Sequence, residues 1–343
     1  MEHSMKPIIA KLVDDKIVIS KPKGIGRIHS KSRIGKLVDN KLYLQPLEAV
    51  FLLEEEKIKL IDDTREITFE ELFKKAADGK NNFETQYLIY RNLRNRGYQP
   101  TIIDQQTLSL NKNLVFTFAE TDATTAFKLE RLCEDINYKE LNNWIGLVDE
   151  EGDITYYDIS LKEPIGEISN RTTIEVEGVL LNNRVILFDQ DKLMQLHRNE
   201  FYGKPFKKGL QLSLIEAFYL MKQKLLTIIK PSGEEVDISL FKEFLEKKHP
   251  EILFRYPIYE DLKKRALIVK TGFKFGTHFR AYTNLPNYTH AEYLIHVIEP
   301  TREIDWSEIS RGIRMAHAVR KTFLFAFKNK NKIIYLKLSR IRP

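Results

Sequence analysis

The chain has 343 residues, of which 43% are hydrophobic and 30% charged, and this length and composition predict a folded protein with two or more domains. No apolar stretch reaches the roughly 20 residues that a membrane-spanning helix needs, which excludes an integral membrane protein of that kind. The N-terminus lacks a secretory signal and Cys133 is the only cysteine, so we expect a cytoplasmic protein without disulfides or zinc–thiolate sites.

The formal net charge of +7 is concentrated near the C-terminus. Residues 301–343 contain eleven Lys or Arg and three acidic residues, which leaves the rest of the chain close to neutral. A basic segment attracts polyanions through phosphate neutralisation and counterion release, so nucleic acid is the first partner to consider. A solvated charged face is the alternative interpretation of the same charges.

The chain is a tandem duplication with a period of about 170 residues. The segment 42–53 matches the segment 210–221, which aligns Glu48 with Glu216 at an offset of 168, and further pairs keep a similar offset. Repeat 1 therefore spans about 7–165, and repeat 2 spans about 173–343.

Both repeats predict the same elements in the same order, from hydrophobic periodicity and from β-branched and aromatic content. Each begins with strands and a helix, and a longer amphipathic helix, β-rich segments, one more helix and a closing hairpin follow. In repeat 1 and repeat 2 respectively, we expect an early strand at 16–20 and 184–188, the long helix at 86–97 and 252–266, and the hairpin at 144–148 with 154–159 and 323–327 with 333–338.

The predicted fold class is α/β (α+β), as a tandem duplication in which each repeat has a small N-terminal α/β subdomain and a C-terminal mixed-sheet subdomain. The expected boundaries are 1–83 and 84–168 in repeat 1, and 169–250 and 251–343 in repeat 2.

Chemically useful side chains are distributed unequally between the repeats. No histidine occurs between His29 and His197, whereas the later part of repeat 2 contains four: His278, His290, His296 and His317. At the hairpin offset of 179, Lys321 aligns with Asn142. These differences predict that only repeat 2 is active. No carboxylate or thiol cluster with metal-ligand spacing accompanies the histidines, so we expect no metal site.

Residues 305–321 predict a helix whose apolar positions face inward and whose other face is basic. Arg314, His317 and Lys321 follow one another at spacings of three and four, which places them on one side, with Lys321 at or just beyond the helix end. Such a row is suited to phosphates, and an ordinary solvated face is the alternative.

Three motifs in order, at 268–282, 289–294 and 314–321, resemble the catalytic core of the tRNA-intron endonucleases. The resemblance implies a subunit with two repeats that pairs as a homodimer, with a restriction-endonuclease-like catalytic subdomain and catalysis only in the C-terminal repeat. The implied partner is precursor tRNA, cleaved at both exon–intron junctions of a bulge-helix-bulge element. No membrane partner and no small-molecule cofactor is implied.

In this family the ribose 2′-hydroxyl attacks the neighbouring phosphodiester, which leaves a 2′,3′-cyclic phosphate and a 5′-hydroxyl without a metal ion. The matching catalytic residues are Tyr282, His290 and Lys321. His290 suits the general acid and Lys321 suits charge stabilisation, while Tyr282 corresponds to the family's proposed base. The division of acid and base work between Tyr282 and His290 stays open.

The resemblance also implies contacts outside the catalytic residues. Arg314 matches an arginine that stacks on a flipped bulge base from the opposite subunit, Arg340 is a candidate for the second half of that clamp, and Arg280 is a further RNA-binding candidate. Family members insert an acidic hairpin turn of the silent repeat into a polar cleft of the partner. The corresponding dimer-contact candidates, for which a solvated hairpin tip is the alternative, are Asp149, Glu150, Glu151 and Asp153.

Two other functions are compatible with part of these observations. The first is a non-catalytic RNA-binding or structural subunit, which predicts that a His290→Ala variant behaves like the wild type. The second is a metal-dependent DNA nuclease on a similar core, which predicts loss of activity in EDTA and indifference to the 2′-hydroxyl.

Overall fold

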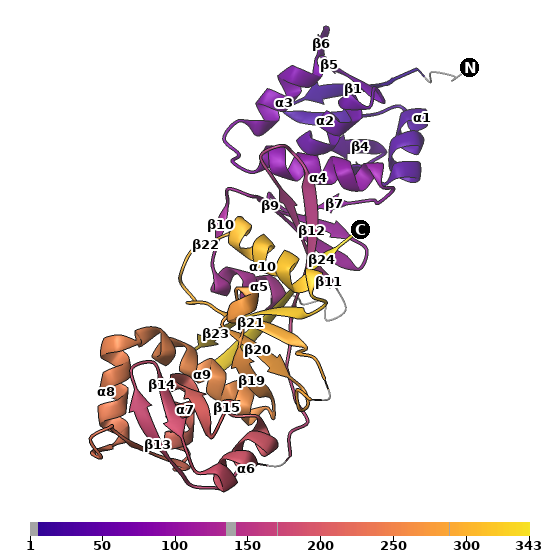
Figure 1. Ribbon diagram of the computed structural model, residues 1–343. Helices are drawn as coiled ribbons and strands as arrows, with labels where there is room; N and C mark the ends of the chain where they lie inside the picture. Colours follow the sequence, from indigo (N-terminus) through magenta and orange to yellow (C-terminus); the bar gives the residue numbers. More distant parts are fainter. Residues whose placement is uncertain (1–5, 135–141, 170, 288) are drawn as a thin grey trace. The chain divides into compact units, whose positions relative to one another are not determined.

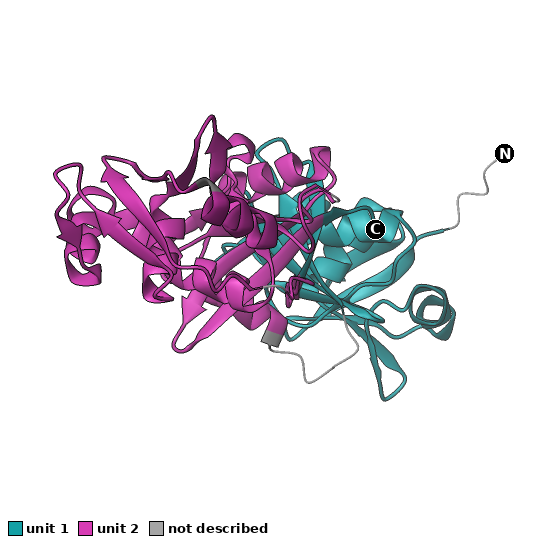
Figure 2. Ribbon diagram, turned by 60° about the horizontal axis from the view of Figure 1, so that its bottom comes forward, with its two compact units in different colours: residues 1–122, 135–159, 340–343 teal, residues 123–134, 160–339 magenta. Residues whose placement is uncertain are grey.

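The computed structural model describes residues 6–134, 142–169, 171–287 and 289–343 (Figure 1). The chain forms two compact units (Figure 2). Unit 1 consists of residues 1–122, 135–159 and 340–343, and unit 2 consists of residues 123–134 and 160–339. None of the helices in the described part of the chain is both long and apolar enough to cross a bilayer. The four subdomain boundaries remain a proposal.

Unit 1 opens with a small α/β arrangement. Its elements are β1 (Ile8–Val13), β2 (Lys16–Ile19), α1 (Pro22–Ile25), the π-helical turn η1 (Gly26–Ser30), β3 (Lys36–Val38), β4 (Lys41–Leu44), α2 (Pro46–Glu54), β5 (Ile58–Asp62), β6 (Arg65–Ile67) and α3 (Phe69–Ala77). The strands form one sheet in the order β3-β4-β2-β1-β5-β6, in which β1 is antiparallel to β2 and parallel to β5.

Unit 2 repeats this arrangement strand for strand. Its elements are β13 (Val176–Leu181), β14 (Arg184–Leu187), α6 (Gln190–Glu200), β15 (Lys204–Phe206), β16 (Gly209–Ser213), α7 (Leu214–Lys222), β17 (Leu226–Ile229), β18 (Glu235–Val236) and α8 (Ile238–Lys248). The sheet order is β15-β16-β14-β13-β17-β18, again with one parallel pair, β13 with β17. Helices α2 and α7 both begin at a capping box closed by the matched glutamates, Glu48 and Glu216. The predicted duplication is confirmed.

The second part of repeat 1 begins with a long helix and continues into a mixed sheet. Its elements are α4 (Phe83–Asn95), β7 (Thr101–Ile102), β8 (Thr107–Leu110), β9 (Asn113–Ala119), β10 (Ala123–Thr124), α5 (Ala126–Glu134), β11 (Asn142–Val148) and β12 (Ile154–Leu161). Neighbouring strands follow the order β7, β8, β9, β11, β12. Among the described residues of these strands, β9 and β11 form the only parallel pair.

The second part of repeat 2 has the same order and the same pairing. Its elements are α9 (Pro250–Lys264), β19 (Ile268–Thr271), the 3₁₀ turn η2 (Phe273–Phe275), β20 (Phe279–Tyr282), β21 (Tyr293–Val297), β22 (Ile304–Asp305), α10 (Trp306–Ala318), β23 (Thr322–Asn329) and β24 (Lys332–Ile341). β20 is antiparallel to β21, β21 is parallel to β23, and β23 is antiparallel to β24. The predicted α/β fold class is confirmed, and so are the predicted strands, long helices and hairpins, to within a few residues.

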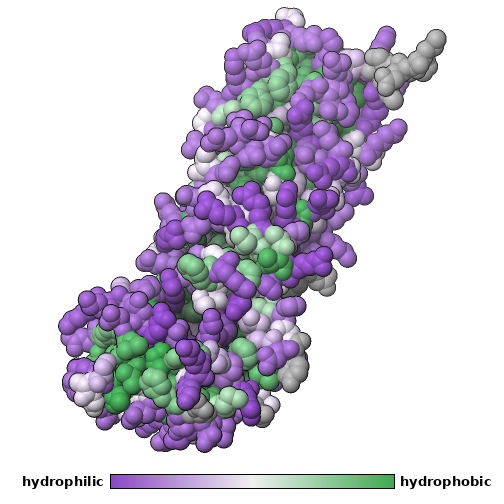
Figure 3. Space-filling model, in the orientation of Figure 1, coloured by the Kyte–Doolittle hydropathy of each residue, from purple (hydrophilic) through white to green (hydrophobic). Residues whose placement is uncertain are grey.

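Each unit has a large hydrophobic core that extends from its first sheet to its second. In unit 2 the apolar faces of α7 and α9 meet in this core with side chains of β19, β20 and β21. Helix α10 lies close against β23, because a Cβ atom on Gly312 would come within 2.5 Å of the Phe323 ring. Figure 3 shows several hydrophobic areas among mostly hydrophilic side chains, and one of them lies where Figure 1 draws β14, α7 and α8.

Candidate active site

Tyr282 ends strand β20 and is only 7% exposed. It lies opposite Ile268 of β19 and belongs to a small apolar cluster with Ile168, Ile268 and Ala291. The guanidinium carbon of Arg280 lies 5.7 Å from the centre of the Tyr282 ring, on the same strand two residues earlier. The Tyr282 ring is therefore held by the apolar cluster and has the Arg280 guanidinium beside it.

Lys321 lies between the end of α10 and the start of β23. The backbone turns there through Arg320, whose φ of 54° is in the left-handed region, so Lys321 leaves the helix face that carries the exposed Arg314 and His317. Its ammonium group donates a hydrogen bond of 2.7 Å to the carbonyl of Ala291. The lysine is thereby fixed on the backbone that immediately follows His290.

His290 is exposed, in the segment that joins β20 to β21. This segment is attached at its end to both neighbouring strands, because the Glu292 amide donates to the Ala281 carbonyl at 3.0 Å and the Glu292 carbonyl accepts from the Thr322 amide at 2.9 Å. The end of β20 and the beginnings of β21 and β23 are therefore adjacent. Tyr282 is the last residue of β20, Lys321 directly precedes β23, and His290 lies three residues before β21.

The electrostatic environment of these strand ends is positive. Burial lowers the pKa of Lys321, and the nearby charges of Arg280 and Lys274 lower it further. The Nε atom of Arg280 is buried and has no hydrogen-bond acceptor among the described residues. Three cations near one another with an unused donor form a suitable environment for a phosphate group.

Within the described residues, the matching strand ends of repeat 1 differ from those of repeat 2 in the length of one connection. Strands β8 and β9 are joined by only two residues, 111–112, whereas β20 and β21 are joined by residues 283–292. Asn142 faces Asn113 across the sheet just as Thr322 faces Tyr293, so the strand register aligns Asn142 with Thr322. The alignment of Lys321 with Asn142 is therefore wrong by one residue, and the position that matches Lys321 falls outside the described residues.

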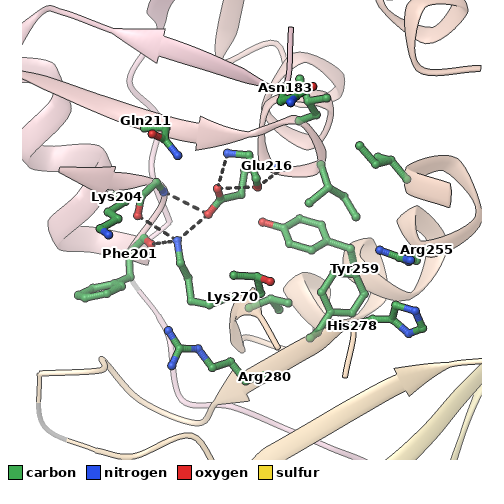
Figure 4. A pocket seen from close by; sticks show the side chains of 18 of the residues that line it. Asn183, Phe201, Lys204, Gln211, Glu216, Arg255, Tyr259, Lys270, His278 and Arg280 are labelled. Carbon is green, nitrogen blue, oxygen red and sulfur yellow. Dashed lines mark hydrogen bonds and ion pairs between the residues drawn. The ribbon is translucent and has the colours of Figure 1, made fainter. Parts of the chain in front are cut away.

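A cavity of about 760 Å³ lies in unit 2 next to Arg280 (Figure 4). Its basic lining residues are Lys204, Arg255, Lys270, Arg280, His197, His249 and His278, and its acidic ones are Glu216 and Glu251. Burial lowers the pKa of His278 to about 3, with a contribution from His296, so that this imidazole is neutral at physiological pH.

Lys270 connects β19 to helix α7 and to the segment between α6 and β15 at this cavity. Its ammonium lies 2.7 Å from the Glu216 carboxylate and donates to the carbonyls of Phe201 and Gly203 at 3.0 Å each (Figure 4). Burial raises the pKa of Glu216, but Lys270 and the hydrogen bonds from Ser213 outweigh burial and leave that pKa below its ordinary value. The sequence interpretation missed this pair, although the repeated glutamate was a signal for it.

The remaining candidates lie on exposed parts of the surface. Arg314 is exposed on α10, and Arg340 is exposed near the end of β24. The four acidic residues of the turn between β11 and β12 are exposed as well. The Asp149 carboxylate organises that turn, since it accepts hydrogen bonds from the amides of Glu151 and Asp153 at 3.0 and 2.8 Å. Within the described residues, no group of three or more His, Cys, Asp or Glu has the arrangement of a metal site.

Comparison with known proteins gives matches along most of the chain. Residues 252–335 match the tRNA intron endonuclease, catalytic C-terminal domain, while residues 8–73 and 176–242 each match the tRNA intron endonuclease, N-terminal domain. Three relatives are all named tRNA-splicing endonuclease. The relative from Methanococcoides burtonii is 31% identical over 97% of this chain and 99% of its own length, and that from Methanosarcina barkeri is 30% identical over 95% and 97%. The relative from Hyperthermus butylicus is 32% identical over 49% of this chain and 99% of its own length, so a whole shorter protein corresponds to about half of this one.

Proposed function

The chain belongs to the tRNA intron endonuclease family, and from that premise we propose that it cleaves precursor tRNA at both exon–intron junctions of a bulge-helix-bulge element by metal-independent attack of the ribose 2′-hydroxyl. The observation that supports this proposal best is the convergence of Tyr282, His290 and Lys321 on three adjacent strand ends of repeat 2.

The reaction needs three catalytic groups from the protein. One group takes the proton from the 2′-hydroxyl as its oxygen bonds to phosphorus, another gives a proton to the departing 5′-oxygen, and a cation stabilises the negative charge on the phosphorane. Lys321 is the cation in this scheme, and the exposed His290 is the acid that meets the 5′-oxygen. Tyr282 is the proposed base, by its match to the base of the family, and the Arg280 guanidinium lies beside its ring. The products are a 2′,3′-cyclic phosphate and a 5′-hydroxyl.

We further propose that two copies of the chain form the enzyme, with one catalytic repeat for each junction. The exposed acidic turn, residues 149–153, is the element that docks into the basic cavity of the partner, and the complementary charges of the turn and of Lys204, Arg255 and Arg280 support this assignment. In the same dimer Arg314 and Arg340 hold a bulge base, since a guanidinium stacks well on a base face.

Incubation of the purified protein with a bulged RNA helix in EDTA tests the chemistry. We expect two cuts, with cyclic phosphate on one side of each cut and a 5′-hydroxyl on the other. A matched RNA with 2′-deoxyribose at both scissile nucleotides should bind and remain whole. Cleavage of the deoxy substrate, or a requirement for a divalent metal, would favour the DNA nuclease alternative, and binding without cleavage of the all-ribose RNA would favour the non-catalytic subunit.

A further inference from the structure

Phe273 is an unusually exposed aromatic residue. Its exposed fraction is 88%, whereas the next most exposed large hydrophobic residues of the described chain, Ile165 and Phe188, are at 64% and 61%. It lies on the 3₁₀ turn η2, which joins the end of β19 to the start of β20, the strand whose other end carries Tyr282. A phenyl ring in water contributes nothing to the core, so packing does not explain this residue.

The turn that presents Phe273 is built to keep one shape. Gly276 has a φ of 65°, and its amide donates to the Phe273 carbonyl at 3.0 Å. Gly272 has no room for a side chain, because a Cβ atom there would lie 2.2 Å from Thr277 Oγ1. The hydroxyl of Thr277 donates to the carbonyl of Phe279 at 3.2 Å. A ring on a fixed turn loses little conformational entropy when it binds a flat partner.

The surroundings of Phe273 favour a polyanion. Lys274 follows it, and the guanidinium carbon of Arg280, the second residue of the strand into which the turn leads, lies 5.7 Å from the centre of the Tyr282 ring. The charges of Lys274 and Arg280 also act on Lys321. The matching turn of repeat 1, between β7 and β8, reads Ile103-Asp104-Gln105-Gln106 and has neither an aromatic ring nor a cation. The exposed ring and the positive charge therefore occur together only in the repeat that has the candidate active site.

We propose that Phe273 stacks on an unpaired base of the RNA next to the scissile phosphate and so helps to select bulged over paired substrates. This inference rests on the proposed function. An aromatic face next to cations binds single-stranded RNA well, because every base has a face to stack and a phosphate to neutralise. A base within a continuous helix is already stacked on its neighbours and cannot accept the ring.

The test uses the full-length protein and a bulge-helix-bulge RNA with 2′-deoxyribose at the scissile nucleotides, so that binding is measured without cleavage. Phe273→Ala should raise the dissociation constant about ten- to hundred-fold, the range expected for the loss of one base–aromatic stack. Phe273→Tyr retains a ring and should stay near the wild-type value. Phe188→Ala is the matched control, since it removes another exposed ring from the same unit, and it should have no effect.

A second readout distinguishes stacking from a structural effect. The RNA carries 2-aminopurine at each bulge position in turn, and the wild-type protein should quench its fluorescence at one position. The Phe273→Ala protein should not quench the fluorescence at that position. Its own melting temperature should equal that of the wild type. Equal affinity and equal quenching in Phe273→Ala would overturn the proposal, and so would a weaker dimer with unchanged RNA binding, which would identify a protein contact. Failure of the wild type to cleave the all-ribose RNA would overturn the proposed function instead.

Discussion

In unit 1, strands β8 and β9 are joined by two residues, whereas in unit 2 the equivalent strands β20 and β21 are joined by residues 283–292, and His290 lies in that longer segment. The framework around both connections is the same, with equal strand order and equal pairing. On the proposed function, in which only repeat 2 is active, the difference between the repeats lies in what is attached to the strand ends. The sheets have the same strand order and pairing in both repeats, so they account for the fold and not for the difference in function.

The two repeats also differ at the buried glutamates that match each other, Glu48 and Glu216. Both Glu48 and Glu216 accept backbone amides at the start of a helix, but only Glu216 has a lysine partner, Lys270. Burial raises the pKa of Glu48 despite two backbone hydrogen bonds, whereas the pKa of Glu216 is below its ordinary value. Repeat 2 thus has an additional ionic connection between α7 and β19, at the edge of the cavity.

The largest effect that we expect from the comparison concerns His290. Replacement by alanine should lower the single-turnover rate on bulged RNA by about 10²- to 10⁴-fold, because the departing 5′-oxygen loses its proton donor. The matched control is His29→Ala in repeat 1, which should cleave at the wild-type rate. A His290→Ala protein that retains full activity would break the distinction between the two repeats.

Loss of Lys270 should produce the next largest effect. Lys270→Met leaves the buried Glu216 carboxylate without its cation and should lower the free energy of unfolding of unit 2 by about 3 kcal/mol, measured by denaturant titration at pH 7. Thr101→Met, at the matching position of repeat 1, should change it by less than about 0.5 kcal/mol.

The pH dependence gives the sign of the Lys270 contribution. Because the folded-state pKa of Glu216 lies below the ordinary 4.5, the stabilisation is present at neutral pH and is lost as the pH falls from about 4.5 through the folded-state pKa. The wild type and Lys270→Met should therefore converge in stability at acidic pH. A difference that persists unchanged below that range would mean that the aliphatic part of Lys270, rather than its charge, matters.

A smaller effect is expected at the acidic turn of repeat 1. Conversion of Asp149, Glu150, Glu151 and Asp153 to their amides should weaken the dimer by about ten-fold in dissociation constant, measured by sedimentation, with the loss reduced at high salt. The control is Asp62→Asn with Asp63→Asn, which neutralises another exposed acidic turn of repeat 1. If the control weakens the dimer equally, net charge and not the turn is responsible.

The sequence predicted the parts of the fold that depend on local pattern. The periodicity of α4 and α9 and the alternation in the closing hairpins were visible in single segments, and the duplication provided each pattern twice. It did not predict Lys270 with Glu216, because that pair joins residues 54 apart through the packing of two sheets. The exposure of Phe273 was hidden as well, since an aromatic residue in a β-rich segment is usually part of a core. A shift of one residue between β11 and β23 was enough to misalign Lys321, as the register of a strand decides which side chain lies at its end.

The smallest expected effect concerns the charge of Lys321, which has no described counterpart in repeat 1. Burial and the charges of Arg280 and Lys274 lower its pKa, so the protonated form that stabilises the phosphorane is lost at a lower pH than in an ordinary lysine. Lys274→Gln removes one of the repelling charges and should therefore raise the pKa of Lys321. Titration of the lysine ¹³Cε resonances by NMR measures this shift. The control is Lys330→Gln, in the turn between β23 and β24, which should leave the pKa of Lys321 unchanged. If the pKa of Lys321 stays constant or falls in Lys274→Gln, then the turn with Phe273 and Lys274 does not act electrostatically on the active site. The proposal that this turn lies next to the scissile phosphate would then be wrong.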